Sequence, residues 1–66
     1  MRTTIETVTI GQLRRLETEA AIAGDSLMME LCGLAMGALG ENRDNERCQA
    51  ALIECVRVIS DAETQL

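Results

Sequence analysis

The sequence predicts an all-α protein: a compact three-helix bundle with an extended N-terminal arm, within one domain spanning residues 1–66. Three observations carry this prediction. Capping residues and glycines divide most of the chain into three segments, and apolar residues recur three and four positions apart within each segment. The only strand-like segment has no partner strand. The predicted elements are an arm at 1–8 and helices at 9–24, 25–40 and 44–65.

The N-terminal arm is rich in β-branched residues, which favour extended backbone. No second candidate strand follows it, and a lone strand cannot satisfy its own hydrogen bonds. We therefore expect an extended or frayed arm, and the alternative is pairing with the same arm of another copy. The residues with this character are Thr3, Thr4, Ile5, Thr7 and Val8.

The first helix has a well-marked start and end. Thr9 and Gln12 have the spacing of a capping box, and Val8 and Leu13 have that of a hydrophobic staple. Gly24 predicts the end, because glycine enters the left-handed conformation without a steric penalty. The apolar face expected between these ends consists of Leu13, Leu16, Ala20 and Ala23.

The second helix is apolar on nearly every side. Asp25 or Ser26 is expected to cap it, and Gly40 to end it. Its only charged side chain is Glu30. A helix of this kind must be covered on most sides, and two neighbouring helices in so short a chain cannot easily do so. This predicts a homodimer, with a tightly packed monomer as the alternative.

Small and flexible residues on the second helix are candidates for self-association. Gly33 and Gly37 lie four positions apart and remove side chains from one face, so that another backbone can approach closely. The alternative is close packing inside the subunit. Thioether side chains suit adaptable binding surfaces and aromatic-free cores alike. The candidate self-association residues are Met28, Met29, Gly33, Met36 and Gly37.

The third helix is expected to be the longest, with Asp44 as its cap. Apolar residues follow one another at intervals of four and three, the pattern of a helix packed along one face. Its expected buried residues are Cys48, Leu52, Cys55, Ile59, Ala62 and Leu66, with Ala51 and Val58 widening the stripe.

Catalytic chemistry has little support in the sequence. The chain contains no His, Lys or Tyr, so the usual general bases are missing. Cys32, Cys48 and Cys55 are the only candidate nucleophiles, and a catalytic cysteine needs a base or a positive environment. They are expected to be inert buried thiols. A zinc site would need Glu30 or a second chain as fourth ligand, and we predict no enzyme, cofactor or metal.

The net charge of −5 limits the possible partners. Direct nucleic-acid binding requires Lys or Arg against phosphates, and adhesion to an anionic membrane requires the same. No segment has the roughly 20 apolar residues of a membrane span, and no signal-peptide core is present. Three cysteines, an odd number, suit reduced thiols. We therefore expect a cytoplasmic protein whose partner is a protein with a basic surface.

Several acids have an arginine three or four positions away, a spacing that suits exposed ion pairs on helices. The acids that we consider for binding a partner include members of these pairs. The expected pairs are Arg43 with Glu46, Arg47 with Asp44, Glu54 with Arg57, and Arg57 with Asp61. The candidate partner-binding acids are Glu17, Glu19, Glu41, Asp44, Glu46, Glu54, Asp61 and Glu63.

Short segments spread over most of residues 9–63 carry a resemblance to a known group of proteins. The segments are Thr9-Ile10-Gly11-Gln12-Leu13-Arg14, Leu16, Glu19-Ala20-Ala21, Ala23-Gly24-Asp25, Leu31-Cys32, and Cys55 with Val58, Ile59 and Ala62. The pattern resembles small acidic proteins encoded by bacteriophages, prophages and plasmids. Some short acidic proteins of this setting are anti-CRISPR inhibitors, several of which occupy DNA-binding surfaces. The resemblance implies a candidate role and assigns nothing to individual residues.

Two functional hypotheses follow from charge, hydropathy and this resemblance. The first is an inhibitor of a host nucleic-acid-handling, CRISPR-type complex, which presents carboxylates where DNA phosphates would lie. The second is a self-associating structural or adaptor module that uses the apolar second helix. An accessory subunit of a larger complex fits the sequence equally well.

Overall fold

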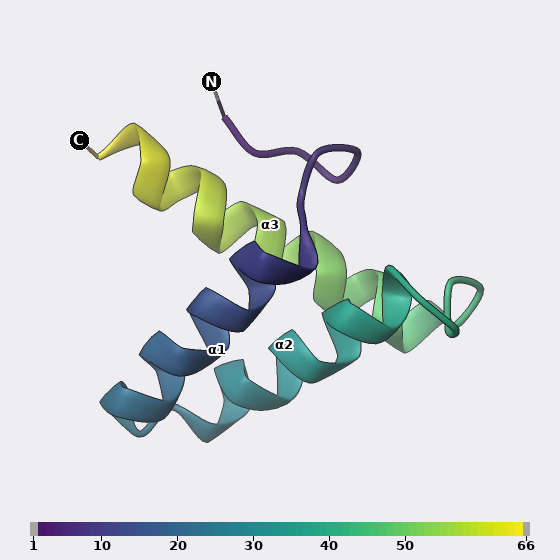
Figure 1. Ribbon diagram of the computed structural model, residues 1–66, viewed down its shortest axis with the longest axis horizontal. Coiled ribbons are helices and arrows are strands. Elements are labelled where there is room, and N and C mark those ends of the chain that lie inside the picture. The colour runs from purple at the N-terminus through teal and green to yellow at the C-terminus, as the bar shows by residue number, and fades with distance from the viewer. Residues whose placement is uncertain (1, 66) are drawn as a thin grey trace.

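Three helices account for most of the chain in the computed structural model, which describes residues 2–65 (Figure 1). They are α1 (Ile10–Ala23), α2 (Ser26–Ala38) and α3 (Glu46–Thr64). No strand occurs among the described residues. The prediction of an all-α three-helix bundle is therefore confirmed.

Helix α2 holds the bundle together. It packs extensively against both α1 and α3, whereas α1 and α3 contact each other only slightly. Figure 1 shows α1 and α2 as a hairpin, with α3 lying across it. The Cα atoms extend 33 × 28 × 17 Å, so the molecule is flat. Because α1 and α3 share so little contact, the angle between them stays open.

The capping prediction for α1 is confirmed. The Gln12 amide donates to Thr9 Oγ1 at 3.2 Å, and the Thr9 amide donates to Gln12 Oε1 at 2.9 Å. Val8 and Leu13, the expected staple, are both buried in the core. Gly24 has φ = 73°, the left-handed conformation predicted for the end of the helix.

The ends of the other two helices differ in part from the prediction. Asp25 caps α2, because its Oδ1 accepts from the Met28 amide at 3.1 Å. The helix ends at Ala38, and Leu39 rather than Gly40 is its C-terminal cap, in a right-handed conformation. Asp44 is not the cap of α3, so that prediction was wrong. Asn45 Oδ1 instead accepts from the second and third helical amides, at 2.9 and 3.1 Å.

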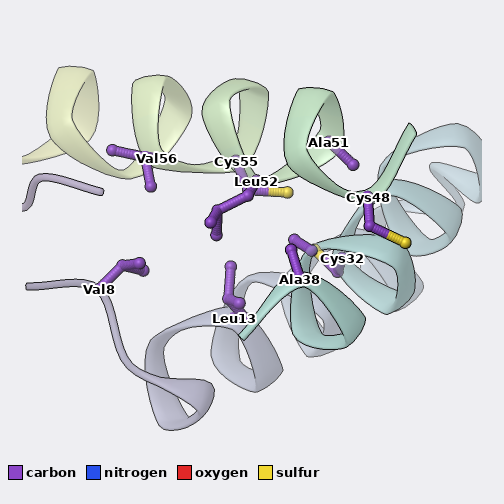
Figure 2. Packing of buried hydrophobic residues seen from close by; sticks show 10 residues of the cluster. Val8, Leu13, Cys32, Ala38, Cys48, Ala51, Leu52, Cys55 and Val56 are labelled. Carbon is purple, nitrogen blue, oxygen red and sulfur yellow. The ribbon is translucent and has the colours of Figure 1, made fainter. Parts of the chain in front are cut away.

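The core is built from aliphatic and sulfur-containing side chains. Leu13, Leu52, Cys32 and Cys55 are the largest side chains that are fully buried. Figure 2 shows Leu13 of α1 pointing toward Leu52 of α3. The rest of the buried cluster is small: Val8, Ala35, Ala38, Cys48, Ala51 and Val56. With no aromatic side chain to fill space, the helices pack closely in a thin layer.

The stripe predicted for α3 is correct from Cys48 to Cys55, correct in part at Ile59, which packs against the core, and wrong at Ala62. Val56 and Ser60 are buried in place of Ala62, which is exposed. The N-terminal segment covers this side of α3, where Arg2 bonds Ser60 and Val8 joins the core. Ile59 and Val58 are only half-buried, and Leu66 lies outside the described residues.

Ala23 was also expected on the buried face of α1, and this prediction was wrong because Ala23 is exposed. It lies in the last turn of α1, at the end of the hairpin farthest from α3 (Figure 1). No third helix reaches this turn. Ala20, one turn earlier, is buried as expected.

We predict that Leu52→Ala lowers the free energy of unfolding by about 2–5 kcal/mol, because it leaves a cavity in a core with no bulky neighbour to close it. Ile53→Ala is the matched control, since Ile53 is 52% exposed against 2% for Leu52. It should cost less than about 1 kcal/mol. Urea unfolding of both variants measures the difference, and equal losses would contradict this description of the core.

Candidate functional site

The N-terminal segment is bound to α3 by a carboxylate. The Thr3 amide donates to Glu63 Oε1 at 2.6 Å, and Thr3 Oγ1 donates to Glu63 Oε2 at 2.7 Å. Gln12 of α1 donates to Thr3 Oγ1 at 2.9 Å, and Arg2 Nε donates to Ser60 Oγ at 2.8 Å. We call this set of hydrogen bonds the arm latch. It ties the start of the chain to its end.

The arm latch changes the interpretation of the N-terminal segment. Residues 2–4 have no regular secondary structure, and a turn follows in which the Thr7 and Val8 amides donate to the Thr4 carbonyl oxygen at 3.1 and 2.9 Å. Thr3 is buried. The expectation of a frayed arm was therefore wrong for the described residues, because long-range hydrogen bonds hold the segment to its own chain.

Three of the eight candidate partner-binding acids contact other groups of the same chain. Glu63 forms the arm latch, Glu54 binds Arg57 at 2.8 Å, and Asp61 lies 3.9 Å from Arg2. The other five lie on α1 (Glu17 half-buried, Glu19 exposed), in the exposed loop before α3 (Glu41 and Asp44), and in the exposed first turn of α3 (Glu46). The acids are thus spread over the molecule and form no single dense surface.

Only one of the expected arginine pairs forms in the described part of the chain, the pair between Glu54 and Arg57. Asp61 interacts with Arg2 rather than with Arg57, because the arm places Arg2 beside the last turns of α3. The remaining expected pairs are not formed among residues 2–65: Arg43 with Glu46, and Arg47 with Asp44.

A groove of about 510 Å³ lies between α1 and α3, where the two helices diverge. We call it the α1/α3 groove. Its apolar lining consists of residues that the sequence pattern placed on buried helix faces but that are only half-buried or, for Ala62, exposed. Charged and polar side chains surround them. The lining consists of Gln12, Arg15, Leu16, Glu19, Val58, Ile59, Ala62 and Glu63.

A second groove, of about 310 Å³, lies between α2 and α3. We call it the α2/α3 groove. It is predominantly aliphatic, with two acids and one arginine. Leu27 at its edge is 67% exposed, an unusually open position for a leucine in so small a protein. The lining consists of Leu27, Glu30, Leu31, Leu34, Arg47, Ala50, Ala51 and Glu54.

The structure separates the residues proposed for self-association into two groups. Met29 and Gly33 are exposed on the outer face of α2, and a Cβ added at Gly33 would meet no atom within 4 Å. Met28 and Met36 are half-buried and pack against the core. At Gly37 an added Cβ would lie 3.3 Å from Asn42 Nδ2 and 3.7 Å from Cys48 Sγ, so this glycine serves packing inside the subunit.

Sequence reasoning missed the most exposed large apolar residues. These are Ile22 at the end of α1, Leu27 at the start of α2, and Ile53, which lies off the predicted stripe of α3. The sequence did contain a sign that Ile53 would be exposed, because this residue falls between the positions, four and three apart, that face the core. The sequence contained no such sign for Leu27, since nearly every face of α2 is apolar.

The three cysteines are reduced and buried, as predicted. Burial raises the pKa of Cys55 to about 12 and also raises the pKa of Cys32, whose thiol lies against that of Cys55 and near the Glu17 carboxylate. Such thiols carry almost no thiolate and are poor nucleophiles. Within residues 2–65, no group of three or more Cys, Asp or Glu side chains lies close enough to hold a metal ion.

No protein family model, curated protein or solved structure matches this chain. The resemblance to small acidic phage proteins therefore stays a prediction. Among the described helices, none combines the length and apolar character that crossing a membrane requires. The candidate functional site is therefore identified from the geometry of the two grooves.

We predict that the arm latch opens in acid. Hydrogen bonds from the backbone and side chain of Thr3 hold the pKa of Glu63 below its ordinary 4.5. The stabilisation from the ionised form is therefore complete above pH 4.5 and is lost as the pH falls through the lowered pKa. The Thr3 amide resonance should follow this titration in NMR spectra of the wild type.

In Glu63→Gln the latch loses its charge and one acceptor oxygen, so the Thr3 amide should exchange faster and lose its acid titration. Glu41→Gln, an exposed loop glutamate, is the control and should titrate like the wild type. An unchanged Thr3 titration in Glu63→Gln would refute the assignment.

We also predict that the native protein resists alkylation at pH 8, because all three thiols are buried and burial raises the pKa of Cys55 to about 12. Ser26→Cys introduces an exposed thiol on α2 as a positive control. Mass spectrometry after iodoacetamide treatment should find this thiol modified and the three native cysteines unmodified until urea is added. Fast modification of native Cys55 would show that a reactive thiol exists.

Proposed function

We propose that this protein is a non-enzymatic binding module whose α1/α3 groove accepts a basic amphipathic helix of a partner protein. One observation supports this proposal above all others. Apolar residues whose spacing is typical of a core lie open between two helices that diverge, and acids from distant parts of the sequence border them. A groove of this kind matches the way amphipathic helices are bound by many proteins.

The apolar part of the groove supplies the driving force. Leu16 of α1 faces Val58 and Ile59 of α3, and all three are half-buried. Ala62 is small and exposed, so it leaves room at the open end of the groove. Removing these apolar side chains from water would supply the favourable free energy of binding, against which the cost of association is set.

The charged rim favours a basic partner. Glu19 lies on the α1 side and Glu63 on the α3 side, against the single cation Arg15. The arm latch lowers the pKa of Glu63, so its carboxylate stays ionised at neutral pH. The net charge of the whole chain, −5, acts in the same direction. These charges increase the rate of association with a basic segment and suppress acidic competitors.

The class of partner follows from the charge and from the resemblance to small acidic phage proteins. Proteins that handle nucleic acids carry clustered Lys and Arg against phosphates. A bound acidic module would place carboxylates where those phosphates lie. We therefore propose an inhibitor of a host nucleic-acid-handling complex of the CRISPR type, acting by occupation of a basic surface.

Two synthetic helices of about 15 residues, with the same leucine face but flanked by Lys or by Glu, test the groove directly. The basic peptide should bind in fluorescence anisotropy, and the acidic peptide should not. Binding of the basic peptide should weaken as salt is added. Ala62→Arg should lower its affinity at least about tenfold, because the new side chain fills the groove and repels the peptide.

Ala21→Arg is the matched control, since Ala21 is also an exposed alanine but lies on α1 outside the groove. It adds the same charge and should leave binding within about twofold of the wild type. Equal affinity for both peptides, or an affinity that does not change with salt, would contradict the charge mechanism. Equal binding by the two variants would exclude the α1/α3 groove as the site.

A further inference from the structure

We infer that the α2/α3 groove is the contact between two copies of this chain, related by a two-fold axis. This surface is separate from the α1/α3 groove, and the two share no lining residue. The inference therefore goes beyond the proposed function and does not depend on it. It rests on the exposed area of the protomer, on the apolar side chains of the groove and on the arrangement of its charges.

The protomer exposes more surface than its mass accounts for. Its accessible area is 4667 Å². A monomer of 7.2 kDa exposes about 4,100 Å² by the usual scaling of area with mass. The excess of about 550 Å² is comparable to the roughly 800 Å² that each subunit buries in a stable interface. A second copy of the same chain is the simplest partner that removes this excess.

The side chains of the α2/α3 groove suit a subunit contact. Leu27 is mostly exposed, and Leu31 and Leu34 are half-buried beside it. Ala50 supplies a small exposed position on α3. On the adjoining face of α2, Gly33 has no side chain and open space above it, so another helix can approach its backbone closely. The sequence predicted only that α2 as a whole would need further cover, and none of its candidate self-association residues lines this groove.

The charges of the α2/α3 groove complement themselves. Glu30 lies on the α2 side and Arg47 on the α3 side, and within the described residues neither forms an ion pair. In a two-fold contact, when one residue of the first copy touches a different residue of the second copy, the reverse contact forms as well. In the arrangement that we propose, Glu30 of each subunit faces Arg47 of the other, which gives two identical pairs. The third charged residue of the groove, Glu54, keeps its pair with Arg57 of its own chain.

Sedimentation equilibrium and light scattering of the purified full chain test this inference. The wild type should have twice the mass of 7.2 kDa, with a concentration-dependent dissociation. Leu27→Asp should give a monomer that keeps its helical circular dichroism, because Leu27 contributes little to the protomer core. Glu30→Arg and Arg47→Glu should each weaken the dimer at least about tenfold.

The double variant Glu30→Arg/Arg47→Glu should restore the wild-type dissociation constant, because both pairs are re-formed with reversed charge. Glu41→Arg and Arg14→Glu carry the same charge changes at exposed positions outside the groove and should leave the dimer unchanged. A wild type that stays monomeric, or a Leu27→Asp variant that stays dimeric, overturns the inference. A double variant as weak as the single ones overturns the two-fold pairing.

Discussion

The position of α2 between α1 and α3 is the constraint on which the rest of the structure depends. This helix is apolar on almost every side, and it packs against both neighbours while they barely contact each other. Its buried residues are small, Cys32, Ala35 and Ala38, so the neighbours come close. A thin core without aromatic side chains results. The α1/α3 groove follows from the slight contact between these two helices, and the α2/α3 groove lies along the edge of the packed α2/α3 pair.

The N-terminal segment partly compensates for the small core. It adds Val8 to the apolar cluster and covers the side of α3 that includes Val56 and Ser60. The arm latch that holds it relies on Glu63. A carboxylate that accepts two hydrogen bonds from one residue is well stabilised in its ionised form, and this acid therefore serves both the fold and the rim of the α1/α3 groove.

The way the chain places its cysteines also bears on its function. The cysteine thiols, which are the strongest nucleophiles of the chain, are used as apolar core atoms, and burial suppresses ionisation of two of them. The exposed side chains include carboxylates, arginines and aliphatic groups. The α1/α3 groove has two acids and one arginine in its lining, and we propose it for a basic partner. The α2/α3 groove, which also has two acids and one arginine, is the one we propose for a second copy.

Local features of the sequence determined the fold class, the caps and the burial of the cysteines. Thr9 with Gln12, Gly24 and Asp25 act on backbone groups only a few residues away, so their effect can be deduced without knowing the fold. The four-three spacing likewise identified Cys48, Leu52 and Cys55 as buried. Asp44 and Asn45 show the limit of this reasoning, because adjacent residues are equally good caps and the preceding turn selects between them.

Tertiary structure alone decided which face of α3 is buried beyond Cys55, which acids remain available to a partner, and which side of α2 stays open. Each outcome depends on contacts between residues far apart in the chain, such as Thr3 with Glu63 and Arg2 with Ser60. Periodicity shows that a helix has an apolar face, but the neighbour that covers it is set by packing. For α2, whose faces are nearly all apolar, only the placement of α1 and α3 left Leu27, Met29 and Gly33 exposed.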